Sequence, residues 1–574
     1  MKKLLRYMRG YRKECVLAPL AKLLEAGFEL FVPLVVASII DKGIGQNDPG
    51  YIGWMCLLLV GLGVVGLAVA VVAQYFAARA ATGFAAKLRH VLFAHLQSLS
   101  YRELDSLGTS TMLTRMTSDM EQVQNGVNLT LRLVLRSPFV VLGAWLMAYT
   151  IDAKAAGVFA VVIPLLFAVV IGIMCLTIPR YRKVQGKLDR VTQTVRENLT
   201  GVRVVRAFGA EQKETERFHA RTKTLYREQT SVGSWSALTN PLTFVIINLG
   251  IVWLVRVGAI RVDSGALTQG QVIALYNYLS QILVELLKTA NCFLQLTRAV
   301  ACGNRIQSVL DLHSSIAAPT QMPQEQAAPI LEFDHVSFRY HGGEPALENL
   351  NLTVRKGQTI GVIGGTGAGK TTLVNLIGRF YDPTEGVIRH NGVDLRDYPL
   401  QDLRSRIGIV PQKAVLFRGT IRENLRWGDA NADDAALLEA AEAAQATDVL
   451  TAKGGLDGEV ESGGRNFSGG QRQRLTIARA LTRKPEILIL DDSASALDFA
   501  TDAALRKALR SLPYQPTVFV ISQRTASLRH ADCIVVLDNG KVVGMGTHEE
   551  LLKTCSVYRE IHESQFGQEA AHEA

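Results

Sequence analysis

Cysteine is scarce in this chain, and long uncharged runs are almost missing from its second half. Only seven of the 574 residues are cysteine, and no two of them form a CxxC pair. So few cysteines exclude a disulfide-stapled fold, and we expect them to be inert, buried thiols in a reducing compartment. The rich aliphatic content excludes collagenous and disordered chains. Because domains average about 150 residues, the length predicts two to four folded units.

The first half contains runs that are long enough to cross a lipid bilayer. Segments 49–78, 155–179, 231–255 and 264–284 contain no charged residue. A membrane-spanning helix needs about 20 mostly apolar residues, because its backbone amides must all be paired internally. Two further candidates carry a few charges. We therefore predict a transmembrane domain over 1–313 with six spans, at 15–40, 51–80, 132–151, 155–179, 231–257 and 264–287.

Basic residues are concentrated beside these spans. The first 13 residues contain six basic side chains and no acid, and segments 79–136 and 180–228 are rich in Lys and Arg. The other connections are short and sparsely charged. Positive-inside asymmetry predicts that both termini and the two long polar connections lie in the cytoplasm. We expect a multi-pass protein of the plasma membrane, of bacterial origin. The net charge of +10 is explained by loops that face anionic lipid, so we expect no nucleic-acid partner. A cleaved signal peptide is disfavoured, since charges interrupt the first apolar stretch.

Several ionisable residues lie inside or beside the predicted spans. Glu25 and Glu29 are four residues apart, so they share one face of a helix. Buried charges in a membrane usually face a bundle interior or an aqueous cavity. The alternative is that such residues lie at the level of the lipid headgroups, or in helix extensions already clear of the membrane. We favour this alternative for most of them and take Glu25 and Glu29 as candidates for a substrate cavity. Similarly spaced pairs are Arg132 with Arg136 and Glu285 with Lys288.

The second half has the pattern of a soluble α/β domain. Residues 314–329 are polar, contain three prolines and show no periodicity, which predicts a linker. Alternating segments follow, and the last of them runs into a glycine-rich turn. We predict one domain over 330–567 and a short tail over 568–574.

The glycine-rich turn fits the phosphate-binding pattern G-x-x-x-x-G-K-[ST], with an apolar strand before it and a helical segment after it. Its glycines allow backbone N–H groups to wrap phosphates, and the start of the helix adds its positive end. Lys370 is expected to neutralise the β- and γ-phosphates and Thr371 to hold Mg²⁺. The predicted ATP-binding residues here are Gly364, Gly365, Thr366, Gly367, Ala368, Gly369, Lys370, Thr371 and Thr372.

A fully apolar strand at 487–490 ends in two carboxylates, Asp491 and Asp492. On its own this pattern also fits an ordinary core strand that ends at a polar loop. About 120 residues after a phosphate-binding loop, Asp491 is better explained as the Walker B carboxylate that orients the ligands of Mg²⁺.

A third motif, Asn466-Phe467-Ser468-Gly469-Gly470-Gln471, lies between these two and opens a helical segment. It is close to the LSGGQ signature of ATP-binding cassette (ABC) proteins. The chain thus resembles an ABC exporter half-transporter over nearly its whole length. The resemblance implies an all-α six-helix transmembrane domain with long cytoplasmic extensions, followed by an α/β P-loop nucleotide-binding domain. It implies ATP and Mg²⁺ as cofactors, and it assigns Ser468, Gly469, Gly470 and Gln471 to the ATP bound by a partner chain.

Other residues take roles from the same resemblance. Tyr340 matches the aromatic residue that stacks on adenine, and Gln412 matches the glutamine that contacts Mg²⁺. Ser495-Ala496-Leu497-Asp498 matches the D-loop. Bends near Tyr101–Gly108 and Thr200–Gly209 resemble coupling helices.

Two positions depart from the family pattern. Asp492 stands where the family usually has the glutamate that acts as base for the attacking water, and Gln523 stands where it has a switch histidine. Losing one methylene withdraws a carboxylate by roughly an ångström, and a misplacement of that order can lower a rate about a hundredfold. A neutral amide can donate a hydrogen bond to a phosphate but cannot carry the positive charge of a protonated histidine. Together the two changes resemble the degenerate half of a heterodimeric exporter.

The resulting hypothesis is an ATP-driven exporter subunit with a second, different half-transporter as partner. Its own Walker motifs bind ATP and hydrolyse it slowly, while its signature completes the competent site of the partner. Amphipathic drugs are the expected cargo. Lipids or peptides, a homodimer with slow ATPase, and an ATP-gated channel or regulator without cargo remain alternatives. An importer is disfavoured, since importers that resemble this family usually place permease and ATPase in separate chains.

Overall fold

The computed structural model describes residues 2–317, 319–325, 328–340 and 342–572, and these residues form two compact units. The first unit contains the residues up to Ser98 together with Leu107–His313. The second contains the chain from Ser314 onward together with Leu99–Ser106. The predicted linker therefore begins where the second unit resumes. Residues 318, 326 and 327 of that linker, and 573–574 of the predicted tail, lie outside the described residues.

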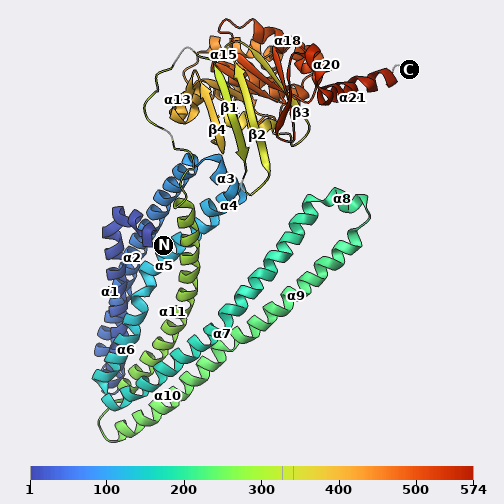
Figure 1. Ribbon diagram of the computed structural model, residues 1–574. Helices are drawn as coiled ribbons and strands as arrows, with labels where there is room; N and C mark the ends of the chain where they lie inside the picture. The colour runs from blue at the N-terminus through green and yellow to red at the C-terminus, as the bar shows by residue number, and fades with distance from the viewer. Residues whose placement is uncertain (1, 318, 326–327, 341, 573–574) are drawn as a thin grey trace. The chain divides into compact units, whose positions relative to one another are not determined.

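The first unit is helical (Figure 1). Its short 3₁₀ and π segments are η1 (Lys2–Tyr11), η2 (Ile39–Ile44), η3 (Arg115–Asp119) and η4 (Thr130–Val134). Its α-helices are α1 (Arg12–Ser38), α2 (Pro49–Ser98), α4 (Thr109–Thr114), α5 (Met120–Leu129), α6 (Arg136–Ile151), α7 (Ala153–Thr200), α8 (Val202–Ala207), α9 (Glu211–Ala237), α10 (Thr239–Asp263) and α11 (Gln269–Leu310). The short helix α3 (Tyr101–Leu107), between α2 and α4 in the chain, belongs to the second unit up to Ser106.

Among the described residues, five helical stretches are long and apolar enough to cross a membrane. They are Lys3–Ile44, Pro49–Ser98, Thr109–Ile151, Ala153–Thr200 and Glu211–Asp263, and they contain the first five predicted spans. The sixth predicted span falls on α11, which begins at Gln269 rather than at 264 because Thr268 forms a capping box with Gln271. Polar side chains such as Asn277 and Gln281 dilute its apolar residues. The sixth span stays a prediction.

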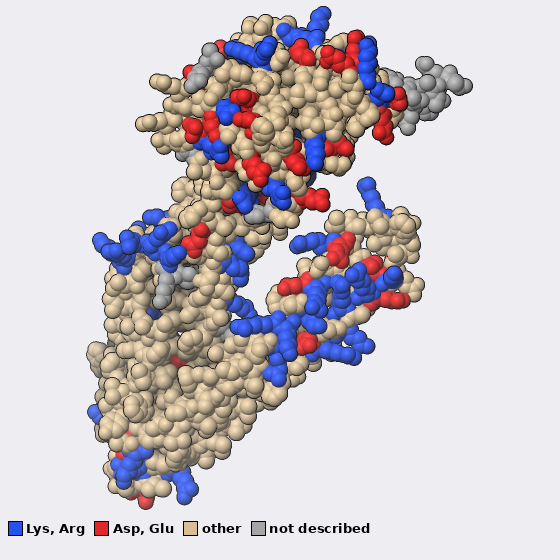
Figure 2. Space-filling view, in the orientation of Figure 1, with Lys and Arg blue, Asp and Glu red and all other residues tan. Residues whose placement is uncertain are grey.

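Small side chains allow the membrane helices to approach closely. Ala18 and Ala26 of α1, and Ala73, Ala77 and Ala80 of α2, are fully buried. Helices in lipid associate mainly through such close van der Waals packing. Large apolar side chains point outward instead, and the middle of this unit is almost free of charge on the face in Figure 2, with Lys and Arg gathered toward its ends. This distribution is the one that a lipid environment favours.

Helices α7, α9 and α10 form a long hairpin with α8 at its tip (Figure 1). Asp152 caps the start of α7 by accepting a hydrogen bond from the backbone N–H of Ala155, at 2.8 Å. The same carboxylate pairs with Arg261 near the end of α10, at 2.5 Å. This contact fixes the two helices to each other at the base of the hairpin.

The second unit contains a four-stranded antiparallel sheet in the order β2-β1-β4-β5, a six-stranded sheet in the order β12-β11-β3-β10-β9-β6, and the pair β7-β8. In the six-stranded sheet all neighbours are parallel except β11 and β12. The strands are β1 (Leu331–Arg339), β2 (Pro345–Val354), β3 (Thr359–Gly364), β4 (Glu385–His390), β5 (Val393–Asp394), β6 (Ile407–Val410), β7 (Gly419–Thr420), β8 (Glu459–Val460), β9 (Ile487–Asp491), β10 (Thr517–Ile521), β11 (Cys533–Asp538) and β12 (Lys541–Gly546).

Helices cover this larger sheet. They are α12 (Lys370–Ile377), α13 (Leu400–Ser405), α14 (Ile421–Leu425), α15 (Asp434–Ala443), α16 (Thr447–Ala452), α17 (Gly469–Thr482), α18 (Phe499–Arg510), α19 (Thr525–Leu528), α20 (His548–Thr554) and α21 (Ser556–His572). Strands β9 and β10 are buried at every position, as expected for parallel strands covered on both faces. Helix α21 continues through the position where the sequence predicts a separate tail to begin. The helical membrane domain followed by an α/β domain confirms the predicted fold class.

Candidate nucleotide-binding site

The glycine-rich turn joins the carboxyl end of β3 to the start of α12, the edge where open α/β sheets bind ligands. Gly367 and Gly369 have φ angles of 84° and 102°, in the region that glycine adopts without strain. At Gly369 a Cβ atom would lie 2.5 Å from the carbonyl oxygen of Ala346. The turn thus requires glycine here both for its backbone conformation and for space.

Lys370 closes over this turn. Its Nζ donates hydrogen bonds to the carbonyl oxygens of Gly364 and Gly365, at 2.7 and 2.6 Å. Burial lowers the pKa of the Lys370 ammonium group, and the negative charges of Asp491 and Asp492 act in the opposite direction. Phosphate oxygens would supply further acceptors for this ammonium group.

Asp491 and Asp492 end strand β9 beside the turn. Asp491 pairs in register with Ile521 of β10 and is buried. Burial raises the pKa of its carboxyl group, and the neighbouring charge of Asp492 raises it further. Asp492 has a φ of 48°, which is uncommon for a residue with a side chain. Its backbone N–H donates to the carbonyl oxygen of Ile521 at 2.9 Å, which holds this turn at the strand end.

Gln412 reaches the same place from the loop after β6. Its Nε2 donates to Oδ2 of Asp492 at 3.2 Å. The fold therefore brings together the predicted glutamine and the predicted base position, which are 80 residues apart in sequence. Among the described residues, no group of three or more His, Cys, Asp or Glu side chains could hold a metal ion. Thr371 offers a hydroxyl, Gln412 a side-chain amide and Asp491 a carboxylate as oxygen ligands for a metal ion.

Tyr340 lies just after strand β1, and its ring is partly exposed. Its hydroxyl is 3.3 Å from Oγ1 of Thr372, and either group could be the donor. The rings of Phe338 and Tyr381 meet it edge-on, with centroids 4.8 and 5.4 Å away. The ring is therefore held in place beside the phosphate-binding turn.

The signature and the D-loop are shaped by local hydrogen bonds. Ser468 is the N-cap of α17 and forms a capping box with Gln471. Ser495 donates from its backbone N–H and its hydroxyl to the carbonyl oxygen of Asp492. Asp498 is the N-cap of α18, and the hydrogen bond from the backbone of Thr501 lowers its pKa. Both motifs thus present glycines or polar groups at the start of a helix.

Gln523 follows β10, one residue after Ser522. The hydroxyl of Ser522 accepts from the backbone N–H of Arg524 at 3.0 Å. The carbonyl oxygen of Gln523 accepts from Nε2 of Gln565 at 2.6 Å. The sequence motifs did not indicate Gln565, because it lies outside any of them, on the last helix.

The segment Leu99–Ser106 packs on the nucleotide unit. The rings of Tyr101 and Phe380 stack with centroids 4.4 Å apart and planes 4° apart. Arg404 lies over the Phe380 ring, 5.0 Å from its centroid, and the Tyr381 hydroxyl bonds to Asp105. This is the first of the two bends that resemble coupling helices, and it joins the second unit through aromatic contacts.

In the membrane unit, Glu25 and Glu29 line one cavity between α1 and α2, whose other walls are mostly apolar. Both carboxylates are paired. Glu25 lies 2.5 Å from Nζ of Lys22, and Glu29 lies 2.6 Å from a guanidinium nitrogen of Arg136. The 40% exposure of the Glu29 side chain keeps part of its carboxylate open to the cavity. The sequence pattern indicated their common face but not these partners.

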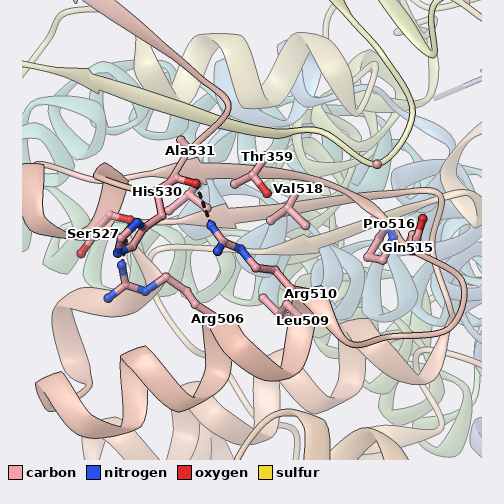
Figure 3. Close-up of a pocket in the computed structure, with 12 residues that line it drawn as sticks. Thr359, Arg506, Leu509, Arg510, Gln515, Pro516, Val518, Ser527, His530 and Ala531 are labelled. Atoms are coloured by element: carbon pink, nitrogen blue, oxygen red, sulfur yellow. Dashed lines mark hydrogen bonds between the residues drawn. The ribbon is translucent and has the colours of Figure 1, made fainter. Parts of the chain in front are cut away.

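Another cavity of the nucleotide unit lies among α18, the α19–β11 connection and the start of β3. The guanidinium groups of Arg506 and Arg510 extend toward Ser527 and His530, and Arg510 donates to the carbonyl oxygen of His530 at 2.7 Å (Figure 3). None of the residues that line it belongs to the predicted ATP motifs. It is therefore not the phosphate-binding site.

Comparisons with known proteins agree with this architecture. The family model for the ABC transporter transmembrane region matches residues 15–286, and the model for the ABC transporter domain matches residues 347–495. An uncharacterized ABC transporter ATP-binding protein of Mycobacterium tuberculosis is 37% identical over 97% of each chain. Another such protein, from Bacillus subtilis, is 35% identical over the whole of both chains. The ATP-dependent lipid A-core flippase of Yersinia pestis is 31% identical over 97% of this chain and 96% of its own.

A solved structure of a bacterial Atm1-family ABC exporter with ATP bound matches with a TM-score of 0.80, covering 96% of this chain and 97% of that one. At 24% identity it shows a common fold. The chain belongs to the ABC transporters. In this chain a multi-pass membrane domain is fused to an ATP-binding cassette, the combination that couples an ATPase domain to transport.

Proposed function

We propose that this chain is one subunit of a heterodimeric exporter of amphipathic small molecules, and that its own Walker motifs form a slowly hydrolysing ATP site. The observation that carries this proposal is the combination of a complete phosphate-binding turn with Asp492 and Gln523 at the two hydrolytic positions. Its intact signature, Ser468-Gly469-Gly470-Gln471, then completes a competent site with a different half-transporter. The proposal includes the cytoplasmic membrane as location, with both termini inside.

The geometry around Asp492 supports slow hydrolysis. The side chain of Asp492 accepts a hydrogen bond from Gln412, and its backbone is held in the left-handed region. A glutamate would extend its carboxylate one methylene further from this fixed backbone. A base that is about one ångström short of its water can lose about a hundredfold in rate.

Mg²⁺ fits the residues beside the phosphate-binding turn. We propose that Thr371, Gln412 and Asp491 would be its protein ligands, with phosphate oxygens and water as the others. Burial raises the pKa of the Asp491 carboxyl although the charge of Lys370 acts in the opposite direction, so a bound cation would stabilise the charged form, and this supports the role. When bound, the ion would neutralise charge on the phosphates.

The test is ATP hydrolysis by the purified full-length chain in lipid nanodiscs. The chain alone is expected to turn over slowly, and the double variant Asp492→Glu with Gln523→His is expected to be at least about tenfold faster. Lys370→Ala in the same background is the control that removes the phosphate contact. Hydrolysis by the unchanged chain at rates usual for exporters, abolished by Asp492→Asn, would refute the degenerate site and favour a homodimer.

The cavity beside Glu25 and Glu29 supports an amphipathic cargo with a positive group. Its walls include Phe28, Val32 and Leu59, and the Glu29 side chain, although it is paired with Arg136, is 40% exposed and adds negative charge to the cavity. We expect Glu29→Gln to weaken uptake of a lipophilic cation into inside-out vesicles that contain the chain and its partner, while Glu14→Gln, outside this cavity, serves as control. Accumulation against a gradient would distinguish a pump from a channel.

Lipid export is the second candidate, and the 31% identity to a lipid A-core flippase favours it. A lipid cargo predicts that nanodiscs of different headgroup composition change ATPase activity, whereas lipophilic cations leave it unchanged. Uptake of the lipophilic cation that is unchanged in Glu29→Gln would also support a lipid cargo.

A further inference from the structure

The last helix, α21, meets the segment that follows β10. The side-chain amide of Gln565 makes two kinds of contact there. Its Nε2 donates to the carbonyl oxygen of Gln523 at 2.6 Å. Its Oε1 accepts from the backbone N–H of Thr525 at 2.9 Å and from the Thr525 hydroxyl at 3.1 Å. One amide group thus binds the backbone on both sides of Arg524.

The sequence of α21 explains why Gln565 points to this segment. Tyr558 is fully buried in the core of the domain, and its hydroxyl lies 2.7 Å from Nδ1 of His548. Ile561 packs against the same core, and Nδ1 of His562 lies 3.1 Å from the Thr525 hydroxyl. Residues three or four apart share a helix face, so Gln565 continues the face that Tyr558 and Ile561 anchor.

We propose that Gln565 is a positioning residue for ATP: it fixes the backbone that carries Gln523, and so determines where the Gln523 side chain meets the γ-phosphate. This inference rests on the proposed function, which places Gln523 at the switch position. Gln565 does not itself touch the nucleotide. It acts through the backbone carbonyl of Gln523 and the backbone N–H of Thr525.

The packing around the hydrogen bonds that Gln565 makes to Gln523 and Thr525, here called the clamp, supports this role. Thr525 is fully buried, and Ser522 holds the N–H of Arg524 from the other direction. The segment between them contains Gln523, whose backbone carbonyl is fixed by Gln565. A side chain that must meet one phosphate oxygen gains affinity when its backbone is ordered before the nucleotide arrives.

A positioning role and a merely structural role predict different results. If Gln565 only stabilised the domain, its loss would weaken MgATP and MgADP binding alike. Because Gln523 faces the γ-phosphate in the proposed function, loss of the clamp should weaken MgATP binding and leave MgADP binding unchanged. A loss of ordering equal to one neutral hydrogen bond of ordinary strength predicts about a fivefold loss for MgATP.

The experiment measures MgATP and MgADP affinities of the purified full-length chain for Gln565→Ala, Gln565→Glu, Gln523→Ala and the double variant Gln523→Ala with Gln565→Ala. Gln565→Glu keeps an acceptor for Thr525 and loses the donor to Gln523, so it should lose about as much MgATP affinity as Gln565→Ala. Ser564→Ala, on the adjacent exposed position of α21, is the matched control. In the double variant, Gln565→Ala should add no further loss to that of Gln523→Ala.

Equal losses for MgATP and MgADP, or full additivity in the double variant, would overturn the inference. So would an unchanged MgATP affinity in Gln565→Ala while Gln523→Ala weakens it, and this result would leave the proposed function intact. An unchanged MgATP affinity in Gln523→Ala would refute the role of Gln523 in the proposed function, and the inference with it. Thermal unfolding of each variant separates a variant that fails to fold from either outcome.

Discussion

The two units bury charge in different ways. In the membrane unit, Arg136 of α6 pairs with Glu29 of α1 and with Glu285 of α11, each at 2.6 Å, and Lys288 lies 3.0 Å from the same Glu285 carboxylate. Each of these charges has a protein partner of opposite sign. In the nucleotide unit, burial and the neighbouring carboxylate of Asp492 raise the pKa of the buried Asp491, and the opposing charge of Lys370 does not cancel this shift.

This comparison distinguishes charged residues that are paired within the chain from charged residues that a bound ligand would neutralise. A buried ion pair that is complete within the chain fixes which helices pack together. A buried carboxylate beside a like charge is costly until a cation arrives, and such sites tend to be functional. The nucleotide site can therefore be recognised because its buried carboxylate is not fully neutralised within the chain. The ion pairs of Arg136, in contrast, hold three membrane helices together.

The largest effect is expected from breaking the membrane network. Arg136→Ala leaves Glu285 buried without its main partner and should lower the unfolding free energy by about 3–5 kcal/mol. Lys288→Ala is the matched control, because Lys288 contacts the same carboxylate but its side chain is 48% exposed. Thermal unfolding in detergent measures both. A loss in Arg136→Ala no larger than in Lys288→Ala would mean that the network does not hold the helices.

His390 tests a third arrangement, a buried titratable group that stays neutral. Burial lowers its pKa from 6.5 to about 4. Between pH 6.5 and 4 the unfolded chain therefore binds a proton at His390 that the folded domain does not bind. The free energy of unfolding is highest above pH 6.5 and falls as the pH drops toward 4. The full loss is about 3 kcal/mol. His390→Leu should reduce the slope of unfolding temperature against pH in this window, and an unchanged slope would contradict the prediction.

Lys370→Ala should weaken MgATP binding about a hundredfold, because it removes charge-assisted hydrogen bonds to the phosphates. Equilibrium binding to the full-length chain is the measurement. Lys356→Ala, near the start of β3 but outside the turn, is the control. If both variants bind MgATP equally well, the turn is not the phosphate site.

The smallest effect should come from Asp491→Asn, and it has the opposite sign. A carboxyl whose pKa is raised in the folded state favours folding when protonated, so at neutral pH its charge lowers stability. The nucleotide-free variant should therefore unfold at a higher temperature, by about 1 kcal/mol in stability, the usual size of a single substitution. This advantage should shrink as the pH falls through the raised pKa of the folded wild-type carboxyl and be lost below the ordinary pKa of an aspartate. A lower unfolding temperature for Asp491→Asn than for the wild type at pH 7 would contradict this expectation.

Much of the fold class could be predicted because its signals are local. Apolar runs of fixed length indicate spans, and the glycine-rich turn requires a strand before it and a helix after it. The family resemblance indicated a coupling helix at Tyr101–Gly108, but the sequence could not predict which residues it contacts, because the stack of Tyr101 on Phe380 depends on tertiary packing. Gln565 was also beyond sequence reasoning, since only the packing of α21 brings it to Gln523.

The chain's own residue pattern determined its family, its membrane segments and the chemistry available at each motif, because these depend on side chains that are neighbours along the chain. Tertiary structure decided which charges meet. Arg136 finds its partners 107 and 149 residues away, and only helix packing can select them among the ionisable residues of the membrane unit. The same holds for Gln412 and Asp492, which adjacent parallel strands bring to one edge of a sheet.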